Sequence, residues 1–155
     1  MWNRKRSVTL SIVVCFIFVG ILTAALFIGP WFVKTWFTAY RGWAENSKAM
    51  SDMLTLFLSC FYPCAAFAYI TLYSLLKVLI NIKKDEIFIS ANVKYLRVIS
   101  WCCFAVALIT LVGGIFYVPF LLVAAAAAFV GLMLRIIKNV MQNAVAISEE
   151  NELTI

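Results

Sequence analysis

Hydrophobic residues fill three long runs of the chain, and nearly all charged residues lie in the segments between them. The longest run, Val98–Leu134, has no acidic, basic or histidine side chain over about 37 residues, whereas one bilayer crossing needs about 20. As a single helix it would be roughly 55 Å long, far more than a hydrocarbon core of about 30 Å. The chain must therefore turn inside this run.

The segment Tyr117–Phe120 is the place where the turn is expected. Its Pro119 removes a backbone donor and pushes Val118 away from helical dihedral angles. The pattern predicts a helical hairpin with a short, uncharged turn at one face of the membrane.

Two further uncharged runs, Ser7–Val33 and Met53–Leu76, are each long enough to cross a bilayer. The first exceeds the apolar core of a secretory signal peptide, so we interpret it as a retained helix. The fold class predicted is an all-α, polytopic membrane protein, a single domain over 1–155 with a short acidic tail at 148–155. Its bundle of four transmembrane helices is expected at about 8–33, 53–78, 96–117 and 120–147.

The segment Lys34–Asp52 mixes aromatic residues with charges, and Trp36, Tyr40 and Trp43 recur at helical spacing. Amphipathic aromatic side chains favour the headgroup layer, so a helix lying on the membrane surface is predicted here. A lid over the bundle is the functional alternative.

Ten of the thirteen Lys and Arg residues fall on one side of this topology, in a chain of net charge +6. They lie in the N-terminal head, in Lys77–Arg97, and at Arg135 and Lys138. Positively charged segments stay inside, which predicts cytoplasmic N and C termini in a bacterial cytoplasmic (inner) membrane. These residues would face anionic lipid headgroups, and nucleic acid is not an expected partner because no basic stripe follows an exposed element.

Pro63 lies within the second predicted crossing, where it should kink the helix and free the carbonyl of Ser59. Such a kink can line a cavity for an uncharged ligand, here with Tyr62, Tyr69 and Tyr73. A purely structural kink is the alternative.

Small residues four positions apart let helix backbones approach closely in lipid. Gly20 and Ala24 have this spacing in the first crossing, and Ala127 and Gly131 have it in the fourth. We expect both pairs at helix–helix contacts, and a homo-oligomer remains open.

The five cysteines all lie inside apolar stretches, so an extracellular disulfide framework is not expected. Cys60 and Cys64 share a helix face and could form a redox site with Cys102 or Cys103. The favoured interpretation is that the cysteines are small packing residues. Histidine is absent from the sequence, and no metal site, cofactor or catalytic residue is predicted.

Candidate docking residues for a partner flank the predicted cytoplasmic face. Ser90 is expected to cap the third helix, Asn92 and Arg97 follow it, and Phe88 precedes it. This segment could bind the acidic tail through Glu149, Glu150 and Glu152, with a soluble partner competing for the same contact. A simple helix start with a cationic anchor is the alternative.

Two stretches carry a family resemblance. Phe88-Ile-Ser-Ala-Asn-Val-Lys-Tyr-Leu-Arg97 resembles the Phe-Ser/Thr-x-x-Asn-Val-x-x-Leu-Arg signature before the third helix of a small bacterial four-helix membrane family. The ending Ser148–Ile155 is similar to the acidic terminus of that family, the YoaS-like proteins, a domain of unknown function. The resemblance implies a cytoplasmic-membrane protein, often encoded beside a small helix-turn-helix regulator, and implies no known chemistry.

The leading functional hypothesis is a non-enzymatic signalling or regulatory membrane component that acts with a cytosolic partner encoded nearby. The first alternative is a carrier or accessory pore for an uncharged or lipophilic solute. No charged residue lies inside these apolar runs, which argues against proton-coupled transport. The second alternative is a membrane thiol oxidoreductase.

Overall fold

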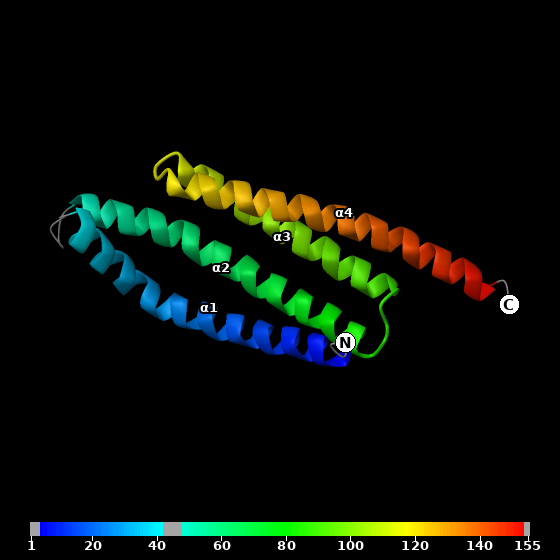
Figure 1. Ribbon diagram of the computed structural model, residues 1–155. Helices are drawn as coiled ribbons and strands as arrows, with labels where there is room; N and C mark the ends of the chain where they lie inside the picture. The colour runs from blue at the N-terminus through cyan, green and yellow to red at the C-terminus, as the bar shows by residue number, and fades with distance from the viewer. Residues whose placement is uncertain (1–3, 42–47, 154–155) are drawn as a thin grey trace.

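The computed structural model describes residues 4–41 and 48–153 and consists of four helices in these ranges. They are α1 (Arg4–Arg41), α2 (Lys48–Lys83), α3 (Ser90–Gly114) and α4 (Pro119–Leu153). Each is long and apolar enough to span a membrane. The protein is thus a four-helix, multi-pass membrane protein, as predicted. In Figure 1 the start of α1 and the end of α4 lie at the same end of the molecule as the α2–α3 connection. We call this the termini end, and the opposite end the turn end.

The hairpin predicted between the third and fourth helices is confirmed. The amides of Phe116 and Tyr117 donate to the carbonyl of Gly113 (3.1 and 3.0 Å), and Phe120 N–H donates to Tyr117 O (3.0 Å). The turn presents exposed apolar side chains rather than charges, among them Val118.

The surface-lying helix predicted for Lys34–Asp52 is wrong. Instead, α1 continues to Arg41 and α2 begins at Lys48, while Trp43 and Ser47 lie outside the described residues. No helix-breaking residue follows Pro30 in α1, and an exposed lysine such as Lys34 does not end a helix at the headgroup layer. Both helices therefore extend beyond the apolar runs that predicted them.

Two prolines lie inside helices, Pro30 in α1 and Pro63 in α2. Each lacks the N–H that would bond the carbonyl four residues earlier. In Figure 1, α1 changes direction between its blue start and its cyan end, as Gly29–Pro30 would allow. The sequence analysis had singled out Pro63 alone.

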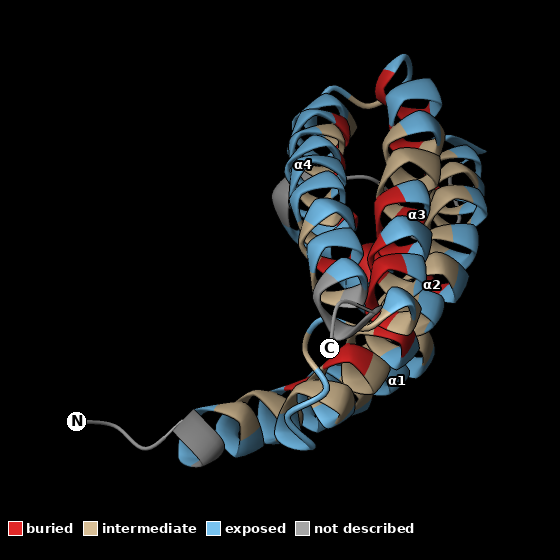
Figure 2. Cartoon of the chain, turned by 90° about the vertical axis from the view of Figure 1, so that its right-hand side faces the viewer, coloured by how far each residue is buried: buried red, intermediate tan, exposed pale blue. Residues whose placement is uncertain are grey.

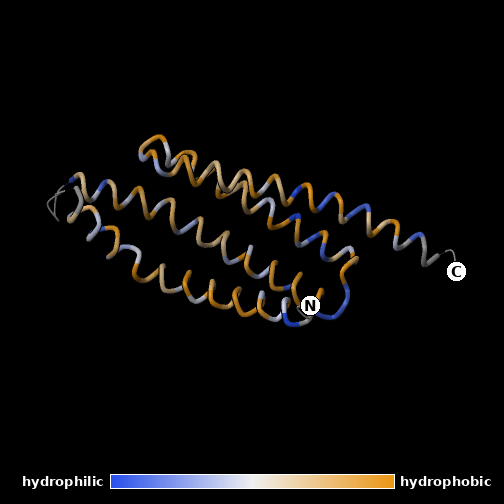
Figure 3. Tube along the Cα trace, viewed as in Figure 1, coloured by the Kyte–Doolittle hydropathy of each residue, from blue (hydrophilic) through white to orange (hydrophobic). Residues whose placement is uncertain are grey.

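Each helix packs against its neighbour in sequence: α1 on α2, α2 on α3, and α3 on α4. Among the described residues, no Cα atom of α1 lies within 8 Å of one in α4. Figure 2 shows little buried surface and large exposed faces, and Figure 3 shows hydrophobic residues along all four helices. Outward-facing apolar side chains of this kind are solvated by lipid.

Several hydroxyl groups of the apolar helix segments bond to the backbone or to a neighbouring helix. Thr23 Oγ1 donates to Val19 O and lies 2.8 Å from Tyr69 Oη, linking α1 to α2. Ser100 Oγ donates to the carbonyl of Gly131 (2.9 Å), linking α3 to α4. No buried side-chain nitrogen or oxygen atom in the described ranges lacks a hydrogen-bond partner.

Glycines at the turn end permit close helix contacts. A Cβ atom at Gly113 would lie 2.8 Å from both Cys60 Sγ and Phe120 Cδ2. At Gly131, a predicted packing position, a Cβ would lie 3.3 Å from Cys103 Cβ. At Gly20, by contrast, a Cβ would meet no described atom within 4 Å.

Candidate functional site

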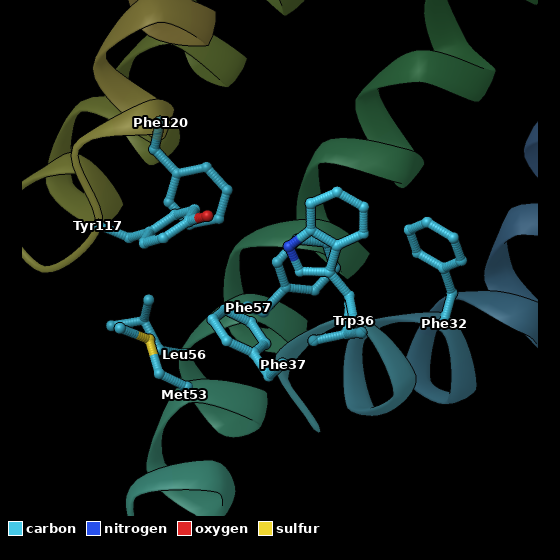
Figure 4. A pocket seen from close by; sticks show the side chains of 9 residues that line it. Phe32, Trp36, Phe37, Met53, Leu56, Phe57, Tyr117 and Phe120 are labelled. Carbon is cyan, nitrogen blue, oxygen red and sulfur yellow. The ribbon is translucent and has the colours of Figure 1, made fainter. Parts of the chain in front are cut away.

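An aromatic pocket of about 390 Å³ lies at the turn end, between the α1–α2 hairpin and the α3–α4 hairpin (Figure 4). Three separate segments build its wall. They contribute, in chain order, Phe32, Val33, Trp36, Phe37, Met53, Leu56, Phe57, Tyr117 and Phe120. Because helical spacing puts residues three and four apart on one face, α1 and α2 each present a short aromatic or apolar stripe to the pocket.

Ring contacts fix the deep wall of this pocket. Phe37 meets Tyr117 edge-on with centroids 6.2 Å apart, and Tyr117 meets Phe120 edge-on at 5.6 Å. Phe57 stacks on Phe120 at 5.9 Å, so α2 contacts α4 here through side chains. Val33, Phe37 and Met50 form the buried core beside the pocket. These contacts hold the two hairpins together where the α1 and α4 backbones are far apart.

The chemistry of the pocket favours an uncharged and largely apolar ligand. No lining residue carries a charge. Phe32 and Trp36 are 56% and 45% exposed, so the pocket is open at the α1 side. The hydroxyl of Tyr117 makes no hydrogen bond to another described residue and lies within the aromatic lining (Figure 4). It is a polar group available to a ligand with a hydroxyl or carbonyl.

A second apolar hollow of about 410 Å³ lies closer to the middle of the molecule. It is lined from all four helices, for example by Leu22, Leu72, Cys103 and Ala127. Ala127, a predicted packing residue, is half-buried and borders this hollow. The aromatic pocket differs from it in having aromatic side chains from three segments around the hydroxyl of Tyr117, whereas Thr71 supplies the hydroxyl of the second hollow.

At the termini end, Asn92 ties the α2–α3 connection together. Its side chain is 0% exposed and its Nδ2 donates to the carbonyls of Glu86 and Ile87, both at 2.9 Å. Its Oδ1 accepts from Asn81 Nδ2 at 2.8 Å. One amide on α3 thus binds the end of α2 and the connecting segment. We call these contacts the Asn81–Asn92 clasp.

The end of α2 adopts a Schellman motif inside this clasp. Glu86 N–H donates to Asn81 O (3.0 Å), and Asp85 N–H donates to Ile82 O (3.1 Å). Asp85 takes the left-handed position with φ 65°, which glycine occupies at lower cost.

Replacing Asp85 by glycine is expected to raise the free energy of unfolding by about 1 kcal/mol, less the interaction that the carboxylate itself makes. Thermal unfolding of the purified protein in detergent measures the change. Glu86→Gly is the matched control, since Glu86 does not have positive φ and glycine there should not stabilise. A destabilised Asp85→Gly variant would show that the carboxylate contact outweighs backbone strain.

The residues predicted to line a cavity, Tyr62, Pro63, Tyr69 and Tyr73, are not in the wall of the aromatic pocket. Tyr62 and Tyr73 are 48% and 59% exposed, and Lys77 Nζ lies 5.5 Å from the Tyr73 ring centroid. Tyr69 bonds to Thr23. The structure does not bring these four residues together around one hollow.

The candidate docking residues divide into two groups. Phe88, Ser90 and Arg97 are exposed, whereas Asn92 is fully buried and serves the clasp. The predicted cap at Ser90 is wrong: α3 begins at Ser90, and Ile89 is the N-cap residue without a side-chain cap bond. Burial at the clasp fixed the start of the helix instead.

The acidic segment predicted as a tail continues α4 as far as Leu153. The side chain of Glu150 is exposed, while those of Glu149 and Glu152 lie outside the described residues. Ala24 is exposed on α1, like Gly20.

All five cysteines are free thiols. Cys60 and Cys64 line a small hollow with Phe120, whereas Cys102 and Cys103 line the larger central hollow. Within the part of the chain that the structure describes, no three His, Cys, Asp or Glu side chains are grouped as metal ligands would be. The thiols thus lie in two different apolar environments.

Sequence reasoning missed the aromatic pocket. The available signal was the recurrence of aromatic residues near the ends of three segments: Phe32 and Trp36, Phe57, and then Tyr117 with Phe120. Each group alone is typical of an aromatic belt. They form one site only because the folded chain brings all of them to the same level at the turn end.

Comparison with known proteins gives a family. No curated protein and no solved structure matches the chain. A family described as protein of unknown function (DUF2975) matches residues 38–155, from the end of α1 through α2, α3 and α4. Because this match covers well over half of the sequence, the protein belongs to the DUF2975 family.

Proposed function

We propose that this protein is a non-enzymatic regulatory membrane component. It binds an uncharged, largely apolar ligand in the aromatic pocket and acts with a cytosolic partner at the termini end. The observation that carries the proposal is the pocket itself, which has nine uncharged lining residues around one free hydroxyl group.

Charge supports the orientation that the proposal needs. The termini end carries the N-terminal basic head, the segment Lys77–Arg97, and Arg135 and Lys138. Such a concentration of Lys and Arg favours the cytoplasmic side, here of a bacterial cytoplasmic membrane. The aromatic pocket then lies toward the outer face, where a lipophilic ligand can enter from the outer leaflet.

The position of the pocket gives the ligand a means to act. It lies between two hairpins whose outer helices, α1 and α4, make no direct backbone contact in the described ranges. A ligand between Trp36 and Phe120 adds contacts that favour one arrangement of the hairpins over another. A partner bound to exposed residues at the termini end, such as Phe88 and Arg97, responds to that arrangement.

Photolabelling with a diazirine-bearing dodecanol tests the ligand site in the full chain, reconstituted in phosphatidylcholine vesicles. The expected result is labelling concentrated in the peptides around Trp36 and around Met53, which face the pocket. Leu56→Trp fills the pocket and should lower labelling there about tenfold, because an added indole occupies much of its volume.

Ile70→Trp is the matched control, because it places the same indole on an exposed face of α2 outside the pocket. It should leave labelling unchanged. Uniform labelling of lipid-facing residues, or equal effects of the two tryptophans, would contradict a specific pocket. The partner is tested separately by co-purification with Phe88→Ala and Arg97→Ala variants, which should lose a bound protein. If both variants retain every protein that the unchanged chain binds, the partner does not bind at these residues.

A further inference from the structure

The face of α4 opposite α3 is exposed from Leu122 to Ile147. Exposed residues follow one another at alternating spacings of four and three: Leu122, Ala126, Phe129, Met133, Ile136, Val140, Asn143 and Ile147. We call this set the α4 seam. Figures 1 and 2 show α4 at the edge of the molecule, with α3 as its neighbour. The seam therefore has no partner within the described chain.

Part of the seam lies beyond the hydrocarbon. The guanidinium carbon of Arg135 lies 5.8 Å from the centroid of the Trp101 ring, a position typical of the headgroup boundary. Ile147 is about 18 Å further along the helix than Arg135. Yet Val140 and Ile147 are 64% and 61% exposed. Lipid covers the exposed apolar side chains of the seam inside the membrane. It does not cover Val140 and Ile147, which lie beyond the headgroup boundary.

The pattern identifies what would cover them. Spacings of four and three define a heptad repeat, the pattern with which a helix packs along a second helix. The positions directly beside the seam on the helix surface are all uncharged, the first being Val123 and the last Ala146. Two copies would therefore not repel each other there. The charged residues Arg135 and Lys138 lie off the seam.

Asn143 is the one polar member of the seam, and its side chain makes no hydrogen bond to another described residue. In a parallel, in-register pair of copies Asn143 lies opposite Asn143, and each amide has both a donor and an acceptor for the other. This pairing requires parallel helices in register. Two copies with the same orientation in the membrane meet that condition.

We propose that the α4 seam is a homodimer interface, in which α4 of one copy pairs with α4 of a second copy in parallel and in register. The contact runs from the membrane into the aqueous segment, and Asn143 pairs with Asn143 of the second copy. This inference does not depend on the aromatic pocket or on its ligand.

Cross-linking in native membranes tests the interface. Val140→Cys and Ile147→Cys are treated with a water-soluble bifunctional maleimide, and the native cysteines, which lie in membrane-spanning helices, give the baseline. The expected product has twice the chain mass of 17.5 kDa. Gln142→Cys, exposed but off the seam, is the matched control and should give about tenfold less product.

A charge at the pairing position provides a second measurement. Asn143→Asp in the Ile147→Cys background should lower the dimer product about tenfold, whereas Gln142→Glu should not change it. Equal cross-linking at Gln142→Cys and the seam positions would overturn the proposal. So would the absence of product, a product whose second component is another protein, or insensitivity to Asn143→Asp.

Discussion

Replacing Asn92 by leucine is expected to lower the free energy of unfolding by about 3 kcal/mol, roughly 10 °C in Tm. Leucine fills a similar volume but cannot form the three hydrogen bonds of the Asn81–Asn92 clasp. The amide of Asn81 and the carbonyls of Glu86 and Ile87 then lose the partner that the fully buried Asn92 supplies. Unfolding in mixed micelles of increasing sodium dodecyl sulfate fraction measures the loss.

Two companion variants show that the loss comes from the clasp. Ser90→Ala, two residues earlier on an exposed position, should change stability by less than about 0.5 kcal/mol. Asn81→Ala combined with Asn92→Leu should cost less than the sum of the two single changes, because both remove the same bond. Additive losses would mean that the two amides act separately.

Replacing Gly113 by alanine is expected to destabilise the protein by about 2 kcal/mol. The new methyl group would lie 2.8 Å from Cys60 Sγ and from Phe120 Cδ2, and overpacking of a close contact costs about 1–3 kcal/mol. The clash is with a side chain of α2 and a side chain of α4 at once, so both must shift to make room. The same unfolding assay measures the effect.

Gly20→Ala is the matched control for this change. A methyl group at Gly20 meets no described atom within 4 Å, so alanine should be neutral or stabilise α1 by up to about 1 kcal/mol. Adding Cys60→Ala to Gly113→Ala removes one of the two clashing atoms and should recover part of the loss. If Gly20→Ala is the more harmful substitution, α1 has a packing partner outside this chain.

The sequence predicted the α3–α4 hairpin accurately because one strong constraint acts there. About 37 uncharged residues do not fit one crossing, and Pro119 leaves few places for the turn. Helix count and the clustering of Lys and Arg near the termini end follow from the same hydrophobic pattern. These features depend on which segments are solvated by lipid and which by water, more than on details of packing.

Helix lengths were harder to predict. A lysine at position 34 and the aromatic residues after it suggested the end of a crossing, but α1 continues to Arg41. Hydrophobic runs report where the hydrocarbon ends, whereas a helix ends where its backbone finds other partners. At the end of α2 those partners are the amides of Asp85 and Glu86, and Asn92 binds the carbonyls of the connection that follows.

The candidate site could not be predicted from the sequence for a related reason. Tyr69 and Tyr73 share a helix face, yet one bonds Thr23 and the other faces outward beside Lys77. The aromatic pocket depends instead on α1 bringing Trp36 level with Tyr117. That alignment reflects how far α1 continues after Pro30, which the hydrophobic pattern does not reveal.

The uncharged turn between α3 and α4 has a consequence for biogenesis. Residues Ile115, Phe116 and Val118 place no ionised group at the leading edge of the hairpin. In the proposed orientation, with the termini end inside, this turn can cross the hydrocarbon without moving a charge through it. The connection between α1 and α2, flanked by Arg41 and Lys48, cannot cross without moving two charged side chains through the bilayer.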